Sequence, residues 1–356
     1  MSEPFSAEAA AAPESRLRAF RNLWRLSHDA TLAGGGRAVA KAYEGDYEFG
    51  VSDAVDRAYR SFAFLTPEYE DIGKTFWRNM DRVMQLGWLP MELCFWTGLL
   101  VQCHCVARQA LGLRVIDYSK DGSPEFLSLA GQAWNKLQPS AQEPDDPYKM
   151  IWMIGNAQLK AVLEDEIKRL REGGEKYQTA GIEAILAAMI TAAYAAFEAL
   201  ASDLWVAALN KHGALAHNYV DKNRDKSLTL SDIRGHGFDL SNRMGTVLVQ
   251  TRRVAFQSFY DVRIAYEQAF RDTLGDVFAD VAAIAEAEKV RHLIAHRSGL
   301  VDDKFKREMV ASANYKDVEV GQQIPFTGPL AAQHIDACSR MGTALFNAVD
   351  AWVAQA

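Results

Sequence analysis

Cysteine is scarce in this sequence, and the few cysteines are scattered. The 356 residues include four, at Cys94, Cys103, Cys105 and Cys338. This number and spacing exclude the disulfide framework of a small secreted domain. The N-terminal residues also lack the charged, apolar and small-residue regions that make up a signal peptide. We therefore expect a protein of the reducing cytoplasm.

Positive charge is also in short supply. The sequence has 39 Lys and Arg against 46 Asp and Glu, which leaves a net charge of −7. A protein that coats nucleic acid without specificity neutralises many phosphates with Lys and Arg, so the composition disfavours this class. A local phosphate-binding site remains compatible with it.

One stretch of the sequence is membrane-like, residues 86–107, but it contains Pro90, Glu92, Gln102 and His104. A membrane-spanning helix needs about twenty nearly uncharged residues in a row. We therefore interpret this stretch as a buried helix and expect no membrane association.

The hydrophobic content is high enough for a sizeable core, at 49% of the residues. At about 150 residues per domain, the length predicts two domains. The segment 138–147 has three prolines, two adjacent aspartates and no large hydrophobic side chain, a composition typical of a linker. We therefore predict a mostly helical N-terminal domain of unknown role over 1–145 and a second helical domain over 150–356.

Apolar residues recur every three or four positions in several segments, as on the buried face of a helix. The clearest stripe runs from Ile182 to Leu209 and stops before Gly213. No strand-rich region is evident, so the predicted fold class is all-α. Prolines and glycines are expected to divide 52–112 into several short helices. Elsewhere we expect helices over 15–30, 156–171, 241–273, 277–298 and 331–353, a loop over 221–237 and a short irregular or hairpin-like stretch over 321–326.

The residues Arg291 and His296 lie at the end of one predicted helix, which Gly299 is expected to stop in a left-handed conformation. Arginine offers a fixed positive fork to phosphoryl oxygens, and histidine exchanges a proton near neutral pH. Five residues at about 100° each place these two side chains roughly 140° apart around the helix axis. Two chains that meet across a two-fold axis would bring both residue types into one cleft.

The spacing of an arginine and a histidine is a weak signal by itself. Arg21 and His28 satisfy the looser form of the same pattern near the N-terminus. No terminating glycine follows that pair, so we assign it no role. The surroundings of the C-terminal copy therefore carry more information than its spacing.

The sequence RHLIAHRSGLVDDKF, at 291–305, resembles the helix end and following turn of HEPN domains. The stretch 192–200, with its internal Phe197-Glu198, resembles an early helix of their bundle, and 256–270 resembles the helix before the motif. The resemblance covers about residues 150–356 and none of 1–150.

This resemblance implies an up-and-down helical bundle that forms a homodimer and cleaves RNA without metal or cofactor. The RNA 2′-hydroxyl would attack the adjacent phosphorus and leave a 2′,3′-cyclic phosphate. Arg291 and His296 would be the essential pair, with His292 as a supporting group. Such enzymes occur in toxin and antiphage defence systems, so an antitoxin or regulatory partner is implied. The alternative is a catalytically inactive HEPN module that binds RNA, a nucleotide or a protein partner.

Two kinds of metal site compete with this interpretation, one with histidine or cysteine ligands and one with the oxygen ligands of a calcium loop. His292 and His296 have the spacing of a two-histidine clip, with Asp302 and Asp303 nearby in sequence, which would suit a metal-dependent hydrolase. No glutamate lies between the histidines as in the metalloprotease signature, so we rank this class lower. Cys103-His104-Cys105 also suggests metal, but residues two apart on a helix diverge, and buried thiols are the better interpretation.

The second competing site is a calcium loop. Its ligands would be Asp221, Asn223, Asp225, Ser227 and Asp232. A lysine stands where the loop turns sharply and needs glycine, and the last ligand is shorter than the usual glutamate. The simpler alternative is a polar loop whose Thr229 or Ser231 caps the next helix.

Overall fold

The computed structural model describes residues 61–113, 123–137, 176–222, 228–279 and 281–356. These residues form α-helices joined by turns, and within them the only β-type pairing is an isolated bridge between Leu300 and Gln323. The all-α fold class is thus confirmed. The helices expected over 15–30 and 156–171, the linker over 138–147, and the pair Arg21 and His28 lie outside the described residues.

Two compact units make up the chain, and they divide it differently from the linker that the sequence suggested. The first comprises residues 1–45 and 90–169, and the second comprises 46–89 and 170–356. The second unit, which carries the motif, thus also takes in a segment that precedes the predicted linker. The two units are described separately below.

In the first unit, helix α6 (Pro124–Leu137) packs against the C-terminal part of helix α4 (Pro67–Ala110). Phe126 and Ala130 form a buried cluster with Ala107, and Ala133 packs with Cys103. The thiol of Cys103 is buried as expected, whereas Cys105 is exposed, which corrects the expectation for that residue. The side chain of Cys94 lies outside the described part.

Helix α4 is one continuous helix of 44 residues, not the several short helices that were predicted. Pro67 stands at its start, where a missing N–H costs nothing because the first turn has no acceptor for it. Pro90 and Gly98 lie inside the helix. An internal proline removes one backbone hydrogen bond and usually bends the helix without always ending it. The boundary between the two units falls immediately before Pro90.

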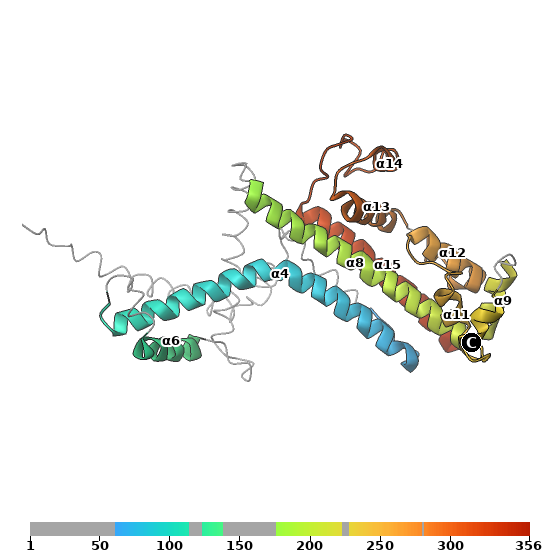
Figure 1. The fold of residues 1–356 in the computed structure, drawn as a ribbon, viewed down its shortest axis with the longest axis horizontal. Helices are drawn as coiled ribbons and strands as arrows, with labels where there is room; N and C mark the ends of the chain where they lie inside the picture. The colour runs from blue at the N-terminus through green and yellow to red at the C-terminus, as the bar shows by residue number, and fades with distance from the viewer. Residues whose placement is uncertain (1–60, 114–122, 138–175, 223–227, 280) are drawn as a thin grey trace, which may run out of the picture. The chain divides into compact units, whose positions relative to one another are not determined.

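Helices α8 (Lys176–Lys211) and α15 (Gly328–Gln355) form the centre of the second unit and lie side by side (Figure 1). The apolar stripe predicted on α8 is buried, including Phe197, Leu200 and Trp205. The part of α8 from Ala180 to Lys211 is long and apolar enough to cross a membrane by length and composition, and half of its most apolar window is buried inside the protein. The closing helix is confirmed as α15.

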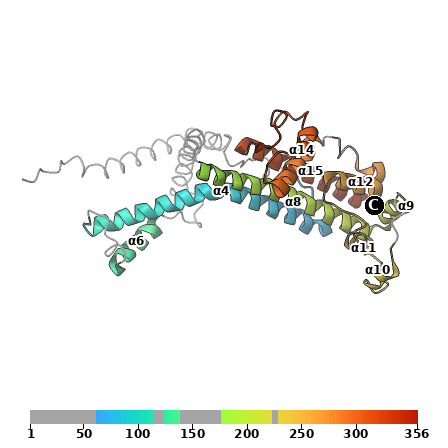
Figure 2. The ribbon, with the colours of Figure 1, turned by 45° about the horizontal axis from the view of Figure 1, so that its top comes forward.

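The shorter helices lie along one side and at one end of this pair (Figures 1 and 2), and α13 contacts both members of it (Figure 1). The loop expected over 221–237 is interrupted, because α9 runs to Lys222 and the short α10 lies within the range at Leu230–Arg234. The single helix expected over 241–273 is divided by a turn in which Arg252 has a φ of 55°. The remaining elements are α9 (Gly213–Lys222), α10 (Leu230–Arg234), α11 (Met244–Gln250), α12 (Phe259–Phe270), the 3-10 helix η2 (Arg271–Leu274), α13 (Ala282–Arg297) and α14 (Asp303–Glu308).

Polar side chains of α15 fix residues 61–66, the segment that leads into α4. The buried carboxylate of Asp350 accepts hydrogen bonds from the backbone N–H groups of Leu65, at 2.6 Å, and Thr66, at 2.8 Å. Asn347 bonds to the backbone of the same segment at Ala63 and Ser61. These bonds hold the segment that precedes α4 against α15.

A buried histidine joins α15 to the segment after α14. The Nε2 atom of His334 lies 2.8 Å from the hydroxyl of Tyr315, and both side chains are almost fully buried. Burial lowers the pKa of His334 to about 4, although the carboxylate of Glu286 acts in the opposite direction. The imidazole is therefore neutral in the folded protein near neutral pH.

The lowered pKa of His334 predicts that the free energy of unfolding decreases in acid. The unfolded imidazole takes up a proton near pH ~6.5, whereas the folded one does so near pH 4. The unfolded state therefore binds more protons between these values, and stability is lost as the pH falls through this window, by about 3 kcal/mol in all. Urea unfolding of the wild type and of His334→Gln across the window measures the effect. An equally steep pH dependence in the variant would contradict the assignment to His334.

Candidate functional site

Two consecutive left-handed residues end helix α13. Ser298 has a φ of 52° and Gly299 a φ of 83°. Their N–H groups bond to the carbonyls of Ile294 and Leu293, at 3.1 and 3.2 Å. The left-handed stop predicted at Gly299 is thus confirmed, and Ser298 shares it.

Space as well as conformation requires glycine at position 299. A Cβ atom there would lie 2.9 Å from the ring of Phe326 and 2.7 Å from Nε2 of Gln323. The amide of Gln323 in turn donates to the carbonyl of Ser298. The helix end is thereby packed directly against the segment that returns from α14.

That returning segment is the hairpin-like stretch expected from the sequence. Val301 and Gln322 are joined by a backbone hydrogen bond of 2.9 Å, and Ile324 donates to the carbonyl of Gly299 at the same distance. Asp302 then begins α14 by accepting a hydrogen bond from the N–H of Phe305. The turn after the motif is therefore held by backbone pairing on one side and by a helix cap on the other.

Arg291 does not point freely into solvent. Its Nη2 atom donates to Oε2 of Glu198 on α8 at 3.0 Å, and 25% of its side chain is exposed. Its guanidinium also lies over the ring of Tyr194, 5.6 Å from the centroid. The two segments that carry the family resemblance, on α8 and α13, thus contact each other through this ion pair.

A polar cluster lies beneath Arg291. Burial raises the pKa of the Glu198 carboxyl, with Arg291 acting against the rise and Glu288 adding to it. Oε1 of Glu198 and the hydroxyl of Tyr194 are buried without a hydrogen-bond partner in the described part of the chain. Glu288 accepts a hydrogen bond from the N–H of Phe259 and so connects α13 to α12.

His292 and His296 are exposed one turn apart, with ring centroids at 4.4 Å. Partial burial and the charges of His296, Lys304 and Arg291 lower the pKa of His292, against a weaker effect of Asp302. The lowered pKa favours a neutral imidazole at position 292 near neutral pH. No hydrogen bond or ring contact joins either histidine to Arg291, whose guanidinium is directed to α8.

The metal site suggested by His292 and His296 has no third ligand among the described residues. Among the described residues, no group of three or more His, Cys, Asp or Glu side chains is placed to hold a metal ion. Asp302 is already used as the cap of α14 and lies 3.7 Å from Arg297. The histidine pair on α13 therefore offers a metal ion only two ligands.

The calcium-loop candidate is partly outside the described residues, namely at Asn223, Asp225 and Ser227. Asp221 belongs to α9. Asp232 forms a capping box with Thr229, in which each side chain bonds to the other residue's backbone N–H. Thr229, and not Ser231, is thus the cap that the simpler interpretation expected. These hydrogen bonds lower the pKa of Asp232 and engage its carboxylate.

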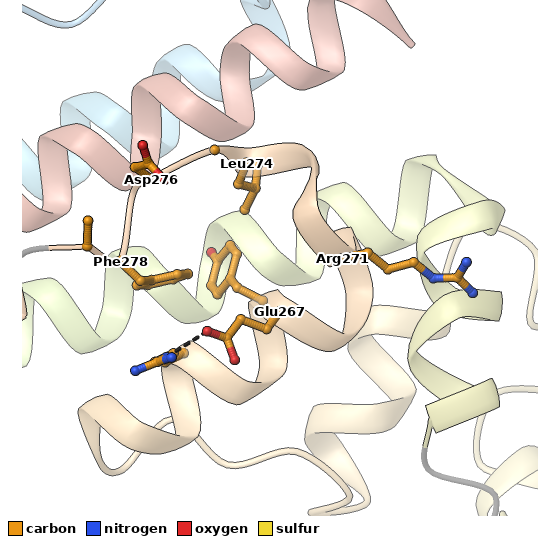
Figure 3. A pocket seen from close by; sticks show the side chains of 9 residues that line it. Glu267, Arg271, Leu274, Asp276 and Phe278 are labelled. Atoms are coloured by element: carbon orange, nitrogen blue, oxygen red, sulfur yellow. Dashed lines mark hydrogen bonds and ion pairs between the residues drawn. The ribbon is translucent and has the colours of Figure 1, made fainter.

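A separate cavity of about 560 Å³ lies between α12, η2 and the segment before α13 (Figure 3). Arg263 and Glu267 form an ion pair of 2.6 Å on its wall, and Arg271 points away from Phe278. None of the motif residues lines it. The lining is formed by Arg263, Tyr266, Glu267, Arg271, Leu274, Gly275, Asp276, Phe278 and Ala279.

Comparison with known proteins adds no family to this chain, since no family model, curated protein or solved structure matches it. The functional assignment consequently depends on the chemistry of Arg291, His292 and His296. From the sequence, Glu198 stands out only as part of a family resemblance and has no predicted role. The available signal was a carboxylate within an apolar stripe, because a charged residue on a buried helix face usually has a buried partner.

The packing at the end of α13 predicts unequal effects of two glycine substitutions. Gly299→Ala should lower the free energy of unfolding by about 2–3 kcal/mol, because a positive φ costs an alanine about 1 kcal/mol and the methyl group also meets Phe326. Gly321 is the matched control, with a φ of 84° and nothing within 4 Å of its added Cβ. Gly321→Ala should therefore cost about 1 kcal/mol. Chemical denaturation measures both, and equal losses would mean that the contact with Phe326 is unimportant.

Proposed function

We propose that this protein is a metal-independent endoribonuclease of the HEPN type that works as a homodimer. The observation that carries the proposal is the contact between Arg291 and Glu198, since it joins the two segments that resemble that family. The exposed imidazoles of His292, the next residue, and of His296, five residues along the same helix, add the acid–base groups that phosphodiester cleavage needs.

Arg291 stabilises the negative charge that develops on the phosphoryl oxygens. Its guanidinium has five N–H donors, of which Glu198 occupies part, so the exposed remainder is free to contact a phosphate. The Glu198 carboxylate and the Tyr194 ring hold the group in place before the substrate arrives. Such preorganised charge needs little rearrangement during the reaction.

His296 transfers the protons of the reaction. The 2′-oxygen forms a bond to phosphorus while its proton passes to an imidazole, and the bond from phosphorus to the 5′-oxygen breaks as that oxygen receives a proton. The products are a 2′,3′-cyclic phosphate and a 5′-hydroxyl. His292 supports the site as a neighbouring imidazole, with its ring centroid 4.4 Å from that of His296.

The direction of Arg291 favours a site shared by two chains. Its guanidinium is directed to α8, whereas His296 is exposed to solvent on α13. Two copies related by a two-fold axis would place the arginine of one chain near the histidine of the other. The proposal extends to a cytoplasmic role in toxin or antiphage defence, where an antitoxin or regulatory partner controls the enzyme.

The principal test is RNA cleavage by the full chain in EDTA. We expect products with 2′,3′-cyclic phosphate and 5′-hydroxyl ends, and a loss of about 100-fold or more in Arg291→Ala and in His296→Ala, because each removes a group from the reaction. His217→Ala is the matched control, because His217 is also exposed and on a helix of the same unit.

The other outcomes separate the competing functions. An absence of cleavage with retained binding would favour the inactive module, and cleavage that requires added metal would favour the hydrolase. Mixing the two inactive variants should restore part of the activity, since a mixed dimer combines the intact residues of both chains. Failure to restore it, with mixed dimers present, would contradict a shared site.

We expect that substitution of Glu198 changes catalysis but leaves the protein folded. Glu198→Gln keeps a side chain of the same size but removes the charge that orients Arg291, so kcat should fall by about tenfold with a smaller change in KM. Stability should stay close to that of the wild type, because the amide oxygen of the variant side chain can still accept the hydrogen bond from Arg291, whose side chain is 25% exposed. Single-turnover kinetics and thermal unfolding measure the two effects. Unchanged kcat in a folded variant would remove Glu198 from the proposed machinery.

A further inference from the structure

Positive charge is concentrated in the segment that contains the motif and α14. Residues 289–307 include six Lys and Arg against two Asp, a net charge of +4, in a chain whose net charge is −7. A local excess of this kind on an acidic protein is the pattern expected of a confined phosphate-binding surface.

Three of the six cations are engaged within the fold. Arg291 is paired with Glu198. Lys306 donates from Nζ to the carbonyls of Lys316 and Val318, at 3.0 and 2.9 Å, and lies 3.1 Å from Glu319. Lys289 donates to the carbonyl of Glu308. The bonds of Lys306 and Lys289 attach α14 to the neighbouring segment and to α13.

The other three cations, Arg297, Lys304 and Arg307, form what we call the cationic rim. The side chains of Arg297 and Lys304 are 60% and 64% exposed, and Arg307 is exposed as well. Arg297 lies 3.7 Å from Asp302, and Lys304 lies 4.0 Å from Glu308. Ion pairs this exposed are worth little and are readily exchanged for a stronger anionic partner.

The backbone that presents the rim is firmly held. Asp302 caps α14, and Phe305 is buried, with its ring in edge contact with that of Tyr315. Lys306 attaches α14 to the following segment through its hydrogen bonds to the carbonyls of Lys316 and Val318. A ligand that binds the rim therefore has to order side chains only, which lowers the entropic cost of binding.

The rim adjoins the imidazoles of the motif. Arg297 follows His296 directly in the last turn of α13. The charge of Lys304 is close enough to His292 to contribute to lowering its pKa. A polyanion held at the rim would thus extend across the exposed histidines.

From these observations we propose that the cationic rim binds the phosphates of an RNA strand on either side of the bond that is cleaved. Arg297, Lys304 and Arg307 contact the backbone of the strand and not its bases, so the rim positions RNA without reading its sequence. The inference rests on the proposed function for the identity of the strand, whereas binding itself does not require cleavage.

The test measures binding without cleavage. A labelled 2′-O-methyl RNA oligonucleotide lacks the attacking hydroxyl, and fluorescence anisotropy follows its binding to the full chain at several salt concentrations. Lys304→Glu/Arg307→Glu should weaken binding by about tenfold or more at about 0.1 M salt. The slope of log K against log salt should fall by roughly 0.7 for each lost contact.

Arg78→Glu/Arg82→Glu is the matched control, because it makes the same charge change at two exposed arginines of α4. It should change affinity much less than the rim variant does. Lys304→Gln/Arg307→Gln should show a smaller loss in the same direction as the charge reversal, and thermal unfolding identifies any variant that fails to fold.

Each outcome distinguishes this inference from the proposed function. A wild type that cleaves RNA while the rim and control variants bind equally well would overturn the rim and leave the function standing. A wild type that binds through the rim but never cleaves would support the rim and overturn the function. Absence of binding by the wild type would overturn the rim whatever the result for cleavage.

Discussion

A partly buried ion pair, between Arg291 on α13 and Glu198 on α8, determines how the end of α13 is presented. Each residue is the charged partner of the other at a partly buried position, so the orientation of each side chain depends on the other. The pair also fixes which part of the guanidinium remains exposed. The ring of Tyr194 supports it from α8, one turn before Glu198, and the histidines remain outside, in solvent.

The rest of the second unit supplies a rigid support for that contact. Helices α8 and α15 pack along each other, and Gly342 allows Phe76 of α4 to approach α15, since an added Cβ there would lie 2.5 Å from the ring. Asp350 ties the beginning of α4 to the same helix. The position of Glu198 is consequently set by a core much larger than the site itself.

The sequence predicted those features that are local. The apolar stripe of α8, the closing helix α15, the stop at Gly299 and the hairpin-like return all follow from periodicity or from turn chemistry within a few residues. The continuity of α4 through Pro90 was missed, because a single proline does not decide where a long helix ends. The division between α11 and α12 was missed as well, because it occurs at Arg252, where no proline or glycine marks a turn. The pairing of Arg291 with Glu198 joins residues 93 positions apart, and no local pattern encodes such a contact.

The uneven distribution of charge has a kinetic consequence. Residues 289–307 carry a net charge of +4 while the whole chain carries −7, so the remaining residues together carry −11. A polyanion approaching at low ionic strength is repelled by most of the chain and attracted to one segment, which orients the encounter before contact. At physiological ionic strength this influence extends about 8 Å, so orientation then depends on the last few ångströms of approach. Encounter rates should therefore reveal the asymmetry of the surface more clearly than equilibrium affinities do.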